Sequence, residues 1–308
     1  NGPQSHRPTR LGVRAIVVHG HCTNTSSHLY RRPRNVLSQK YKPRHTTIIM
    51  NRILIAEIRK IKGSGFLPAS FIAFALAPLM GGVFLVMIQH PSVMKGAGGL
   101  AAKAEAMHFE ANWASYFQLL SQAVGVGGVL IFGFVISWLF GREYTDGTAK
   151  DMLALPASRR QIIHAKLVVY LLWCLALATS NLLLGGIIGA LPGIDLPITG
   201  PFFPMLAHYY ATVVLTLLTM VPIAFFALWG RGFLTPLGFV ALTLVFSQIV
   251  AAVGFGWWWP WAIPGLFSGA SGVVTTGLGT TSIMVVLLTA VVGYGITTTF
   301  WVYADHTK

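Results

Sequence analysis

The acidic side chains that could carry catalysis or bind a metal lie outside the apolar stretches of this 308-residue sequence. They are Glu57, Glu105, Glu110, Glu143, Asp146, Asp151, Asp195 and Asp305. No G-x-x-x-x-G-K-[ST] motif is present to hold a nucleotide phosphate, and neither H-E-x-x-H nor G-x-S-x-G occurs to supply a hydrolase centre. We therefore expect no catalytic residue, no metal and no cofactor bound directly by the chain.

A few polar side chains do fall within or beside the apolar stretches. We expect Asn181, Ser247 and Gln248 to form hydrogen bonds between helices, with a path for substrate as the alternative. His208 could be a proton site, but a lone histidine near a helix end favours a structural role. Carriers driven by ions or protons usually need buried ionisable groups, so this sequence does not favour a self-sufficient carrier.

Residues 142–166 form the segment richest in charges of both signs. Gly147 can adopt a positive φ and end a helix that continues from the preceding apolar stretch. We expect a short helix over residues 148–155, stopped by Pro156, and a helix N-cap at Ser158.

The predicted shape is a compact elbow that presents acids before Gly147 and bases after Pro156 to a soluble partner. These charges are Glu143, Asp146, Arg159 and Arg160. A rigid elbow can transmit a push from such a partner. The alternative is a solvated basic loop that only enforces topology.

The rest of the sequence predicts the elements that position this elbow. Hydrophobic residues make up 54% of the chain and charged residues only 10%, far below the ~25% of a soluble domain. Six stretches are long and apolar enough to cross a bilayer as helices. They are Phe66–Ile88, Tyr116–Phe140, Leu167–Ala190, Met205–Trp229, Phe233–Phe255 and Ser282–Val302. The fold class is therefore an all-α, polytopic membrane protein.

The basic residues orient these spans. If the Met50 end lies in the cytoplasm, the inner segments hold Arg52, Arg59, Lys60, Lys62, Arg142, Lys150, Arg159, Arg160, Lys166, Arg231 and Lys308, while the outer loops hold only Lys95 and Lys103. Cytoplasmic loops carry the excess of Lys and Arg. We therefore expect both ends in the cytoplasm and a multi-pass protein of the plasma (inner) membrane.

Residues 1–49 differ from the rest, with nine Lys or Arg and no acid. One interpretation is a disordered basic tail that binds anionic lipid or nucleic acid, and another is a transit peptide. We favour a third, in which 1–49 is a disordered or non-native extension and residues 50–308 form the transmembrane domain.

The 142–166 segment resembles the loop between the second and third spans of ABC-2 type transporter permeases. The family pattern is roughly E-Y-x-x-G-T-x-x-x-L-L-x-x-P-x-S-R, followed by a Lys before the next span. The matching residues are Glu143, Tyr144, Gly147, Thr148, Leu153, Pro156, Ser158, Arg159 and Lys166, with Met152 in place of the first Leu.

Two further features carry the same resemblance. Glu57 and Lys60 lie on an amphipathic stretch, Ile53–Ile61, which is similar to the connecting helix before the first span of this family. The segment Trp259-Pro260-Trp261-Ala262-Ile263-Pro264, which we expect to be bent, resembles the bacitracin- and lantibiotic-export-like subgroup.

The resemblance implies a permease subunit rather than an enzyme. It implies a separate cytosolic ATP-binding cassette subunit that docks on the 142–166 loop and supplies ATP, and a second permease copy, identical or related. Membrane lipid is the other expected partner, and nucleic acid is not one. The implied function is export of a hydrophobic or peptide antibiotic, hence antibiotic resistance. The alternatives are an ATP-independent carrier or channel and an intramembrane enzyme acting on lipid.

Overall fold

The computed structural model describes residues 43–90, 109–148, 158–191, 202–270 and 278–304, together with the isolated positions 2, 92, 98, 99 and 102. The chain divides into two units, Asn1–Lys42 and Pro43–Lys308, and every helix described below belongs to the second. Within these ranges the regular structure is entirely helical, which confirms the all-α prediction.

Six described helices or helix pairs are long and apolar enough to cross a membrane, as the sequence predicted. They are α2 (Phe66–Gln89), α5–η1–α6 (Trp113–Gln122, Ala123–Gly127, Gly128–Thr145), α8 (Arg159–Ala190), α9–α10 (Phe202–Met220, Ile223–Trp229), α11 (Leu234–Ala252) and α13 (Thr280–Tyr303). The element η1 is a π-helical turn inside the second span. Short helices η2 (Gly256–Trp258) and α12 (Ile263–Phe267) form the expected bent segment between α11 and α13.

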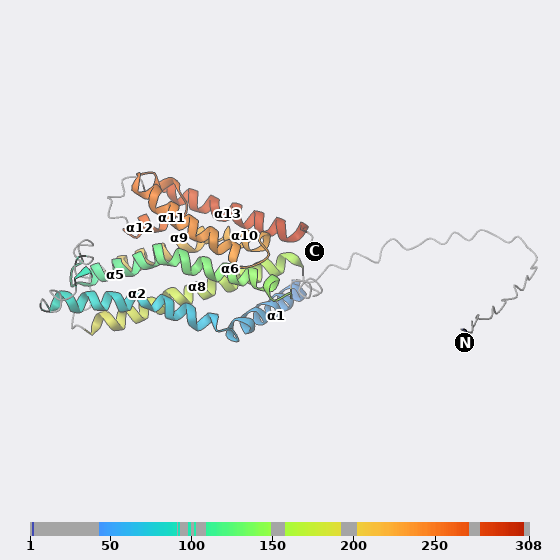
Figure 1. Cartoon of the computed structure of the whole chain (residues 1–308), viewed down its shortest axis with the longest axis horizontal. Helices are drawn as coiled ribbons and strands as arrows, with labels where there is room; N and C mark the ends of the chain where they lie inside the picture. The colour runs from blue at the N-terminus through green and yellow to red at the C-terminus, as the bar shows by residue number, and fades with distance from the viewer. Residues whose placement is uncertain are drawn as a thin grey trace, which may run out of the picture. The chain divides into compact units, whose positions relative to one another are not determined.

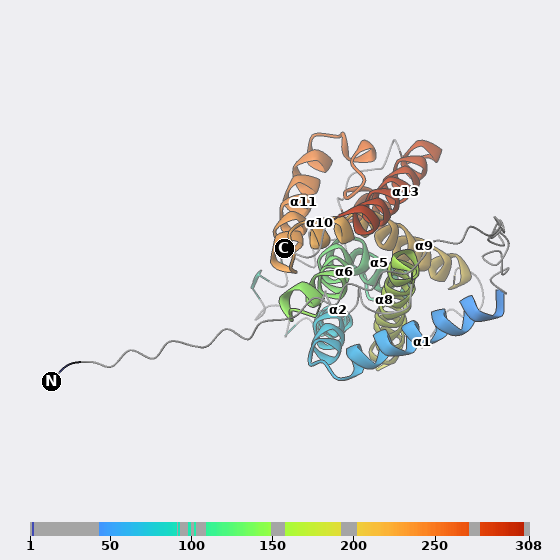
Figure 2. The same ribbon diagram turned by 90° about the vertical axis from the view of Figure 1, so that its right-hand side faces the viewer.

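The second and fourth spans form the centre of the bundle. Their most apolar windows are 61% and 67% buried, whereas those of α11 and α13 are each 22% buried. Figures 1 and 2 show α11 and α13 on one side of these central spans and α2 and α8 on the other. Spans that are mostly unburied and apolar need a hydrocarbon environment or another protein surface to cover them.

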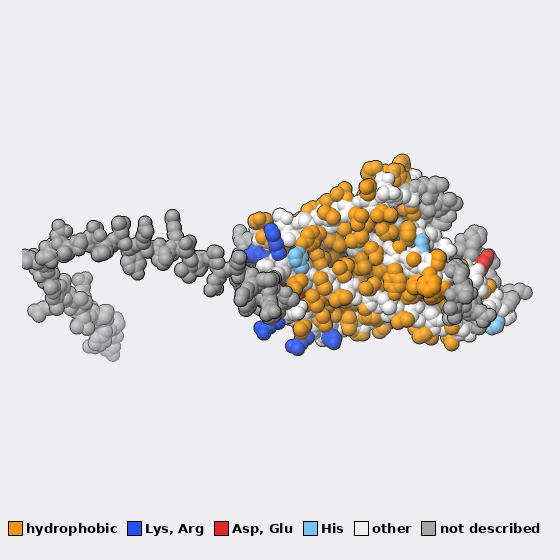
Figure 3. Space-filling model, turned by 180° about the vertical axis from the view of Figure 1, so that it is seen from behind, with side chains coloured by type: hydrophobic (Ala, Val, Ile, Leu, Met, Phe, Trp, Pro, Cys, Tyr) orange, Lys and Arg blue, Asp and Glu red, His pale blue; other side chains and the backbone are white. Residues whose placement is uncertain are grey.

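The exposed surface of the bundle is a hydrophobic belt. Large apolar side chains such as Ile72, Leu183 and Leu288 are 68%, 64% and 65% exposed. Figure 3 shows this belt in orange, with Lys and Arg side chains gathered at one end of it. The belt and the basic end agree with a multi-pass membrane protein, while the placement of both chain ends in the cytoplasm stays a prediction.

Close helix contacts depend on glycines. A side chain added at Gly185 would meet Leu120 at 2.6 Å, and one at Gly189 would meet Trp113 at 2.7 Å. These two glycines lie one turn apart on α8 and let α5 approach closely, as a small-xxx-small pair does in membrane helices.

Asn181 supplies a hydrogen-bond donor to a backbone carbonyl that lacks one because of a proline. Pro78 lies inside α2 and has no N–H to donate to the carbonyl of Phe74, one turn earlier. The side-chain amide of Asn181 on α8 donates to that carbonyl at 2.9 Å, and the hydroxyl of Tyr209 donates to Asn181 Oδ1 at 3.3 Å. The predicted interhelical role of Asn181 is therefore confirmed.

We expect Asn181→Leu to lower the free energy of unfolding by about 2 kcal/mol, because it leaves a buried carbonyl without a donor. The thermal unfolding midpoint of the purified protein in detergent measures this loss. Ser180→Ala on the same helix is the matched control, since Ser180 only donates to Leu177 of its own helix. Equal midpoints for the two variants would contradict the repair role of Asn181.

The first helix, α1, spans Pro43–Lys62. It therefore begins before the boundary that we expected at Met50. Residues 43–49 are too few and too polar for their sequence pattern alone to indicate a helix. The rest of the N-terminal segment lies outside the described residues, so its native or non-native origin stays a prediction. The next span begins after a short turn at Gly63–Gly65.

Candidate functional site

Four of the residues singled out in the sequence form one ion cluster, in which Glu57, Glu143 and Lys166 are buried and Lys60 is partly exposed. Lys166 Nζ lies 2.8 Å from Glu143 Oε1 and 3.3 Å from Glu57 Oε2. Lys60 Nζ lies 2.9 Å from Glu57 Oε1 and 3.1 Å from Glu143 Oε1. Lys166 also donates to the carbonyl of Leu139 at 2.9 Å, so its ammonium group has three acceptors. The sequence placed these residues in two separate motifs, and the fold brings them together.

The cluster joins three elements at one end of the bundle. Glu57 and Lys60 come from α1, Glu143 from the last turn of α6, and Lys166 from the third turn of α8. Glu57, Glu143 and Lys166 are only 3%, 4% and 3% exposed. Buried charges are stable only when they are paired and hydrogen-bonded, and this cluster meets both conditions.

The position of Glu143 corrects one expectation about the elbow. The second-span helix continues past its apolar stretch through Glu143 to Thr145, and the third-span helix begins at Arg159 before Lys166, as the expected helix end at Gly147 and helix start after Ser158 imply. Because Glu143 is buried against Lys166, it does not face a soluble partner as the elbow hypothesis required. Charged residues end an apolar stretch in the sequence, but the helix continues through them when each charge is paired with an opposite charge inside the fold.

The electrostatics keep the α1 half of the cluster charged at neutral pH. Burial acts to raise the pKa of Glu57, but Lys166 and Lys60 outweigh it and hold this pKa below its usual value. Burial acts to lower the pKa of Lys60, but Glu143 and Glu57 outweigh it and raise this pKa above its usual value. The stabilisation from Glu57 is thus full above about pH 4.5 and is lost as the pH falls through the depressed pKa. That from Lys60 is full below about pH 10.5 and is lost as the pH rises through the raised pKa.

Local chemistry shapes both ends of the elbow as predicted. Gly147 has φ = 71° and follows Asp146, the residue that caps the C-terminal end of α6, where glycine relieves the strain of a left-handed conformation. Ser158 Oγ accepts from the N–H of Gln161 at 3.2 Å, and Gln161 Oε1 accepts from the N–H of Ser158 at 3.0 Å. This reciprocal capping box starts α8 at Arg159. Leu153 and Pro156, with the short helix expected over 148–155, lie outside the described residues.

The remaining elbow residues connect it to its neighbours. The ring of Tyr144 meets that of Trp301 on α13 edge-on, with centroids 6.4 Å apart. Arg159 Nη1 donates to the carbonyl of Val302 at 2.8 Å, which caps the last turn of α13. Thr148 is exposed just after Gly147. Both sides of the elbow are therefore attached to the end of the last span.

Arg142 connects α6 to α1, and the sequence reasoning did not single it out for this role. Its Nη1 donates to the carbonyl of Lys60 at 3.1 Å, and its Nε donates to Asp146 at 2.8 Å. The guanidinium also lies 4.8 Å from the ring centroid of Trp138. The four-residue spacing to Asp146 indicated a helix pair, but no sequence signal indicated the contact with α1.

The other half of the bundle holds two grooves, one of which is lined in part by the π turn. A groove of about 520 Å³ lies between α2, α5–η1 and Gln248 of α11, and another of about 500 Å³ includes His208 and Phe267. The rings of His208 and Phe267 stack with centroids 4.5 Å apart, which supports a structural role for this histidine. Gln248 lines the first of these grooves, and no hydrogen bond from its side chain to another helix is found among the described residues.

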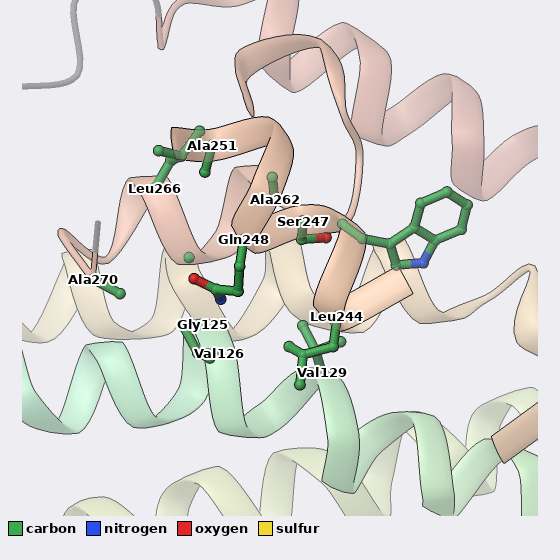
Figure 4. A pocket seen from close by; sticks show the side chains of 12 residues that line it. Gly125, Val126, Val129, Leu244, Ser247, Gln248, Ala251, Ala262, Leu266 and Ala270 are labelled. Atoms are coloured by element: carbon green, nitrogen blue, oxygen red, sulfur yellow. The ribbon is translucent and has the colours of Figure 1, made fainter. Parts of the chain in front are cut away.

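A smaller cavity of about 20 Å³ lies at the same level, with room for about one water molecule. Figure 4 shows Gln248 extending from α11 toward Gly125 and Val126 of the π turn. Ser247 donates to Thr243 of its own helix at 2.6 Å. The expected hydrogen bond between helices is therefore wrong for Ser247.

Six apolar helices with a charged joint at one end define a multi-pass membrane protein. The family model described as ABC-2 family transporter protein matches residues 53–250, which is more than half of the chain. The chain therefore belongs to the ABC-2 family, as a membrane subunit of an ATP-binding cassette transporter. Such permeases generally pair with an ATP-binding subunit and are generally not enzymes.

The chain is also similar to the bacitracin transport permease protein BCRB of Bacillus licheniformis, at 28% identity over 138 residues. This similarity covers 44% of the chain and 65% of the relative, slightly under two thirds of its length. No solved structure matches the chain. The resemblance to permeases of bacitracin export is confirmed.

Proposed function

We propose that this permease exports a hydrophobic or peptide antibiotic-like compound across the plasma membrane, using ATP hydrolysed by a separate cytosolic subunit. That subunit would dock on the 142–166 elbow of each of two permease copies. The buried ion cluster carries the proposal, because it joins α1, α6 and α8 into one unit. A push on the elbow would then move the second and third spans together instead of bending a loose loop.

The substrate class rests on the bacitracin permease relative. In a bacitracin-sensitive bacterium, we propose that the permease produced with its ATP-binding subunit raises the bacitracin concentration needed to stop growth. The matched control is the same pair with a hydrolysis-deficient ATP-binding subunit. Unchanged resistance, together with no bacitracin-stimulated ATP hydrolysis in reconstituted vesicles, would contradict this substrate.

A carrier that works without ATP receives less support. A proton-coupled carrier needs a carboxyl group that gains and loses its proton near neutral pH. Glu57 has a lowered pKa and stays ionised there, since Lys166 and Lys60 flank it. This half of the cluster therefore acts as a structural joint rather than as a proton relay.

The docking role predicts a backbone effect at Gly147. A side chain added there would meet no atom within 4 Å, so any loss on substitution comes from the positive φ and not from a clash. We expect Gly147→Val to reduce co-purification of the ATP-binding subunit by roughly 5–30-fold, the equivalent of 1–2 kcal/mol of strain. Gly147→Asn is the control, because asparagine tolerates this conformation. Equal co-purification by the two variants would show that the elbow only enforces topology.

A further inference from the structure

We propose that the outward face of α1 is a binding surface for the phosphate groups of anionic phospholipids. This surface, the basic ridge, consists of Arg52, Arg59 and Lys62, with Ile55 between them. The proposal is independent of the transported substrate and of the docking role of the elbow.

Helix geometry places the ridge on one face. Arg52, Ile55, Arg59 and Lys62 follow one another at steps of three, four and three residues, which align side chains along an α-helix. All four are exposed, whereas Glu57 and Ile61 on the opposite face are 3% and 6% exposed. The ridge extends for about 15 Å along the helix axis.

The charges of the ridge are not neutralised within the described part of the protein. Lys60 is paired with Glu57 and Glu143, but Arg52, Arg59 and Lys62 have no acidic partner among the described residues. The single acid of α1, Glu57, is buried on the other face. The ridge therefore offers three cations to an external anion, and arginine suits phosphate because its guanidinium can donate two parallel hydrogen bonds.

The place of α1 in the fold favours lipid as that anion. Its last residue is joined through Gly63–Gly65 to Phe66, where the first span begins, so this end of α1 lies at the end of a membrane-crossing helix. Ile55, at 50% exposure, adds an apolar side chain among the cations. Basic and apolar side chains together are typical of helices that lie at the surface of a bilayer.

The structure also holds α1 firmly enough to present the ridge. The ion cluster anchors its inner face through Glu57, and Arg142 caps its last turn through the carbonyl of Lys60. A lipid phosphate on the outer face would therefore meet cations carried on a helix whose backbone is already held in place. Less ordering entropy is then lost on binding than with a flexible basic tail.

The test measures lipid retention by the full-length permease, purified in detergent without its ATP-binding subunit. Native mass spectrometry would follow the titration with phosphatidylglycerol or with phosphatidylcholine. We expect preferential retention of phosphatidylglycerol, weakened in Arg52→Gln/Arg59→Gln by roughly 25-fold, or about fivefold for each charge near an anionic surface. Phosphatidylcholine retention should be unchanged, and rising salt should weaken only the phosphatidylglycerol binding.

Two control variants separate charge from other effects. Arg52→Lys/Arg59→Lys keeps both charges and should keep most of the phosphatidylglycerol preference. Arg160→Gln removes an exposed cation from α8 and should leave the preference intact. Equal retention of both lipids by the wild type would overturn the proposal, as would unchanged phosphatidylglycerol binding in the double Gln variant. If that variant keeps the lipid, and a separate co-purification with the ATP-binding subunit shows that it no longer binds that subunit, the ridge is a protein-docking surface instead.

Discussion

Replacing Lys166 by methionine should lower the free energy of unfolding by about 3–5 kcal/mol, the usual loss when one partner of a buried ion pair is removed. Lys166 lies between the carboxylates of Glu143 and Glu57, at 2.8 and 3.3 Å. Without it, two buried negative charges keep only Lys60, whose side chain is 40% exposed. The thermal unfolding midpoint and the monodispersity of the detergent-purified protein measure this loss.

Two further variants make the Lys166 prediction specific. Lys60→Met removes a cation from the same cluster, but we expect a loss of only about 1 kcal/mol because solvent screens this residue. The pair Glu143→Gln/Lys166→Met removes one charge of each sign and should recover part of the stability lost in Lys166→Met. If Lys166→Met is no worse than Lys60→Met, the cluster does not stabilise the joint between α1, α6 and α8.

The sequence was informative wherever a structural feature depends on neighbouring residues. The six spans follow from stretches of apolar residues, and the helix end at Gly147 and the helix start at Ser158 follow from backbone preferences of single residues. The partner of Asn181 was not predictable. The carbonyl of Phe74 lacks a donor because Pro78 has no N–H, and Phe74 is 107 residues away from Asn181 in the sequence. Hydropathy likewise could not predict that Glu143 is buried, since its burial depends on the ion pair with Lys166.

The ion cluster required the fold for a similar reason. Glu57 and Lys166 are 109 residues apart, and no local pattern indicates that they meet. The resemblance to the permease family marked the residues of the cluster but assigned them to separate motifs. The burial of Glu143 and Lys166 changes the interpretation of the elbow, because these two charges hold helices together, whereas Thr148 and Arg160 are exposed.

Gly141→Ala should destabilise the same end of the bundle by about 3 kcal/mol, at the upper end of the usual cost of overpacking a core. A side chain added at Gly141 would lie 2.5 Å from the carbonyl carbon of Gly232 and 2.7 Å from the nitrogen of Phe233. Both are backbone atoms, so no rotamer change can relieve the overlap. The turn between α10 and α11 would have to move away from α6. Arg231 already has a positive φ of 49° in this turn, which leaves its backbone little freedom to adjust.

The control for Gly141 is another helical glycine with open space around it. A side chain added at Gly186 on α8 would meet no atom within 4 Å, so Gly186→Ala should be neutral or stabilise the helix by up to ~1 kcal/mol. The two substitutions add the same methyl group, and the difference between their unfolding midpoints measures the overlap with the backbone of Gly232 and Phe233. Opposite signs are expected, because alanine favours a helix wherever nothing opposes its methyl group. A Gly141→Ala midpoint equal to or above that of Gly186→Ala would mean that the turn and α6 are not in close contact.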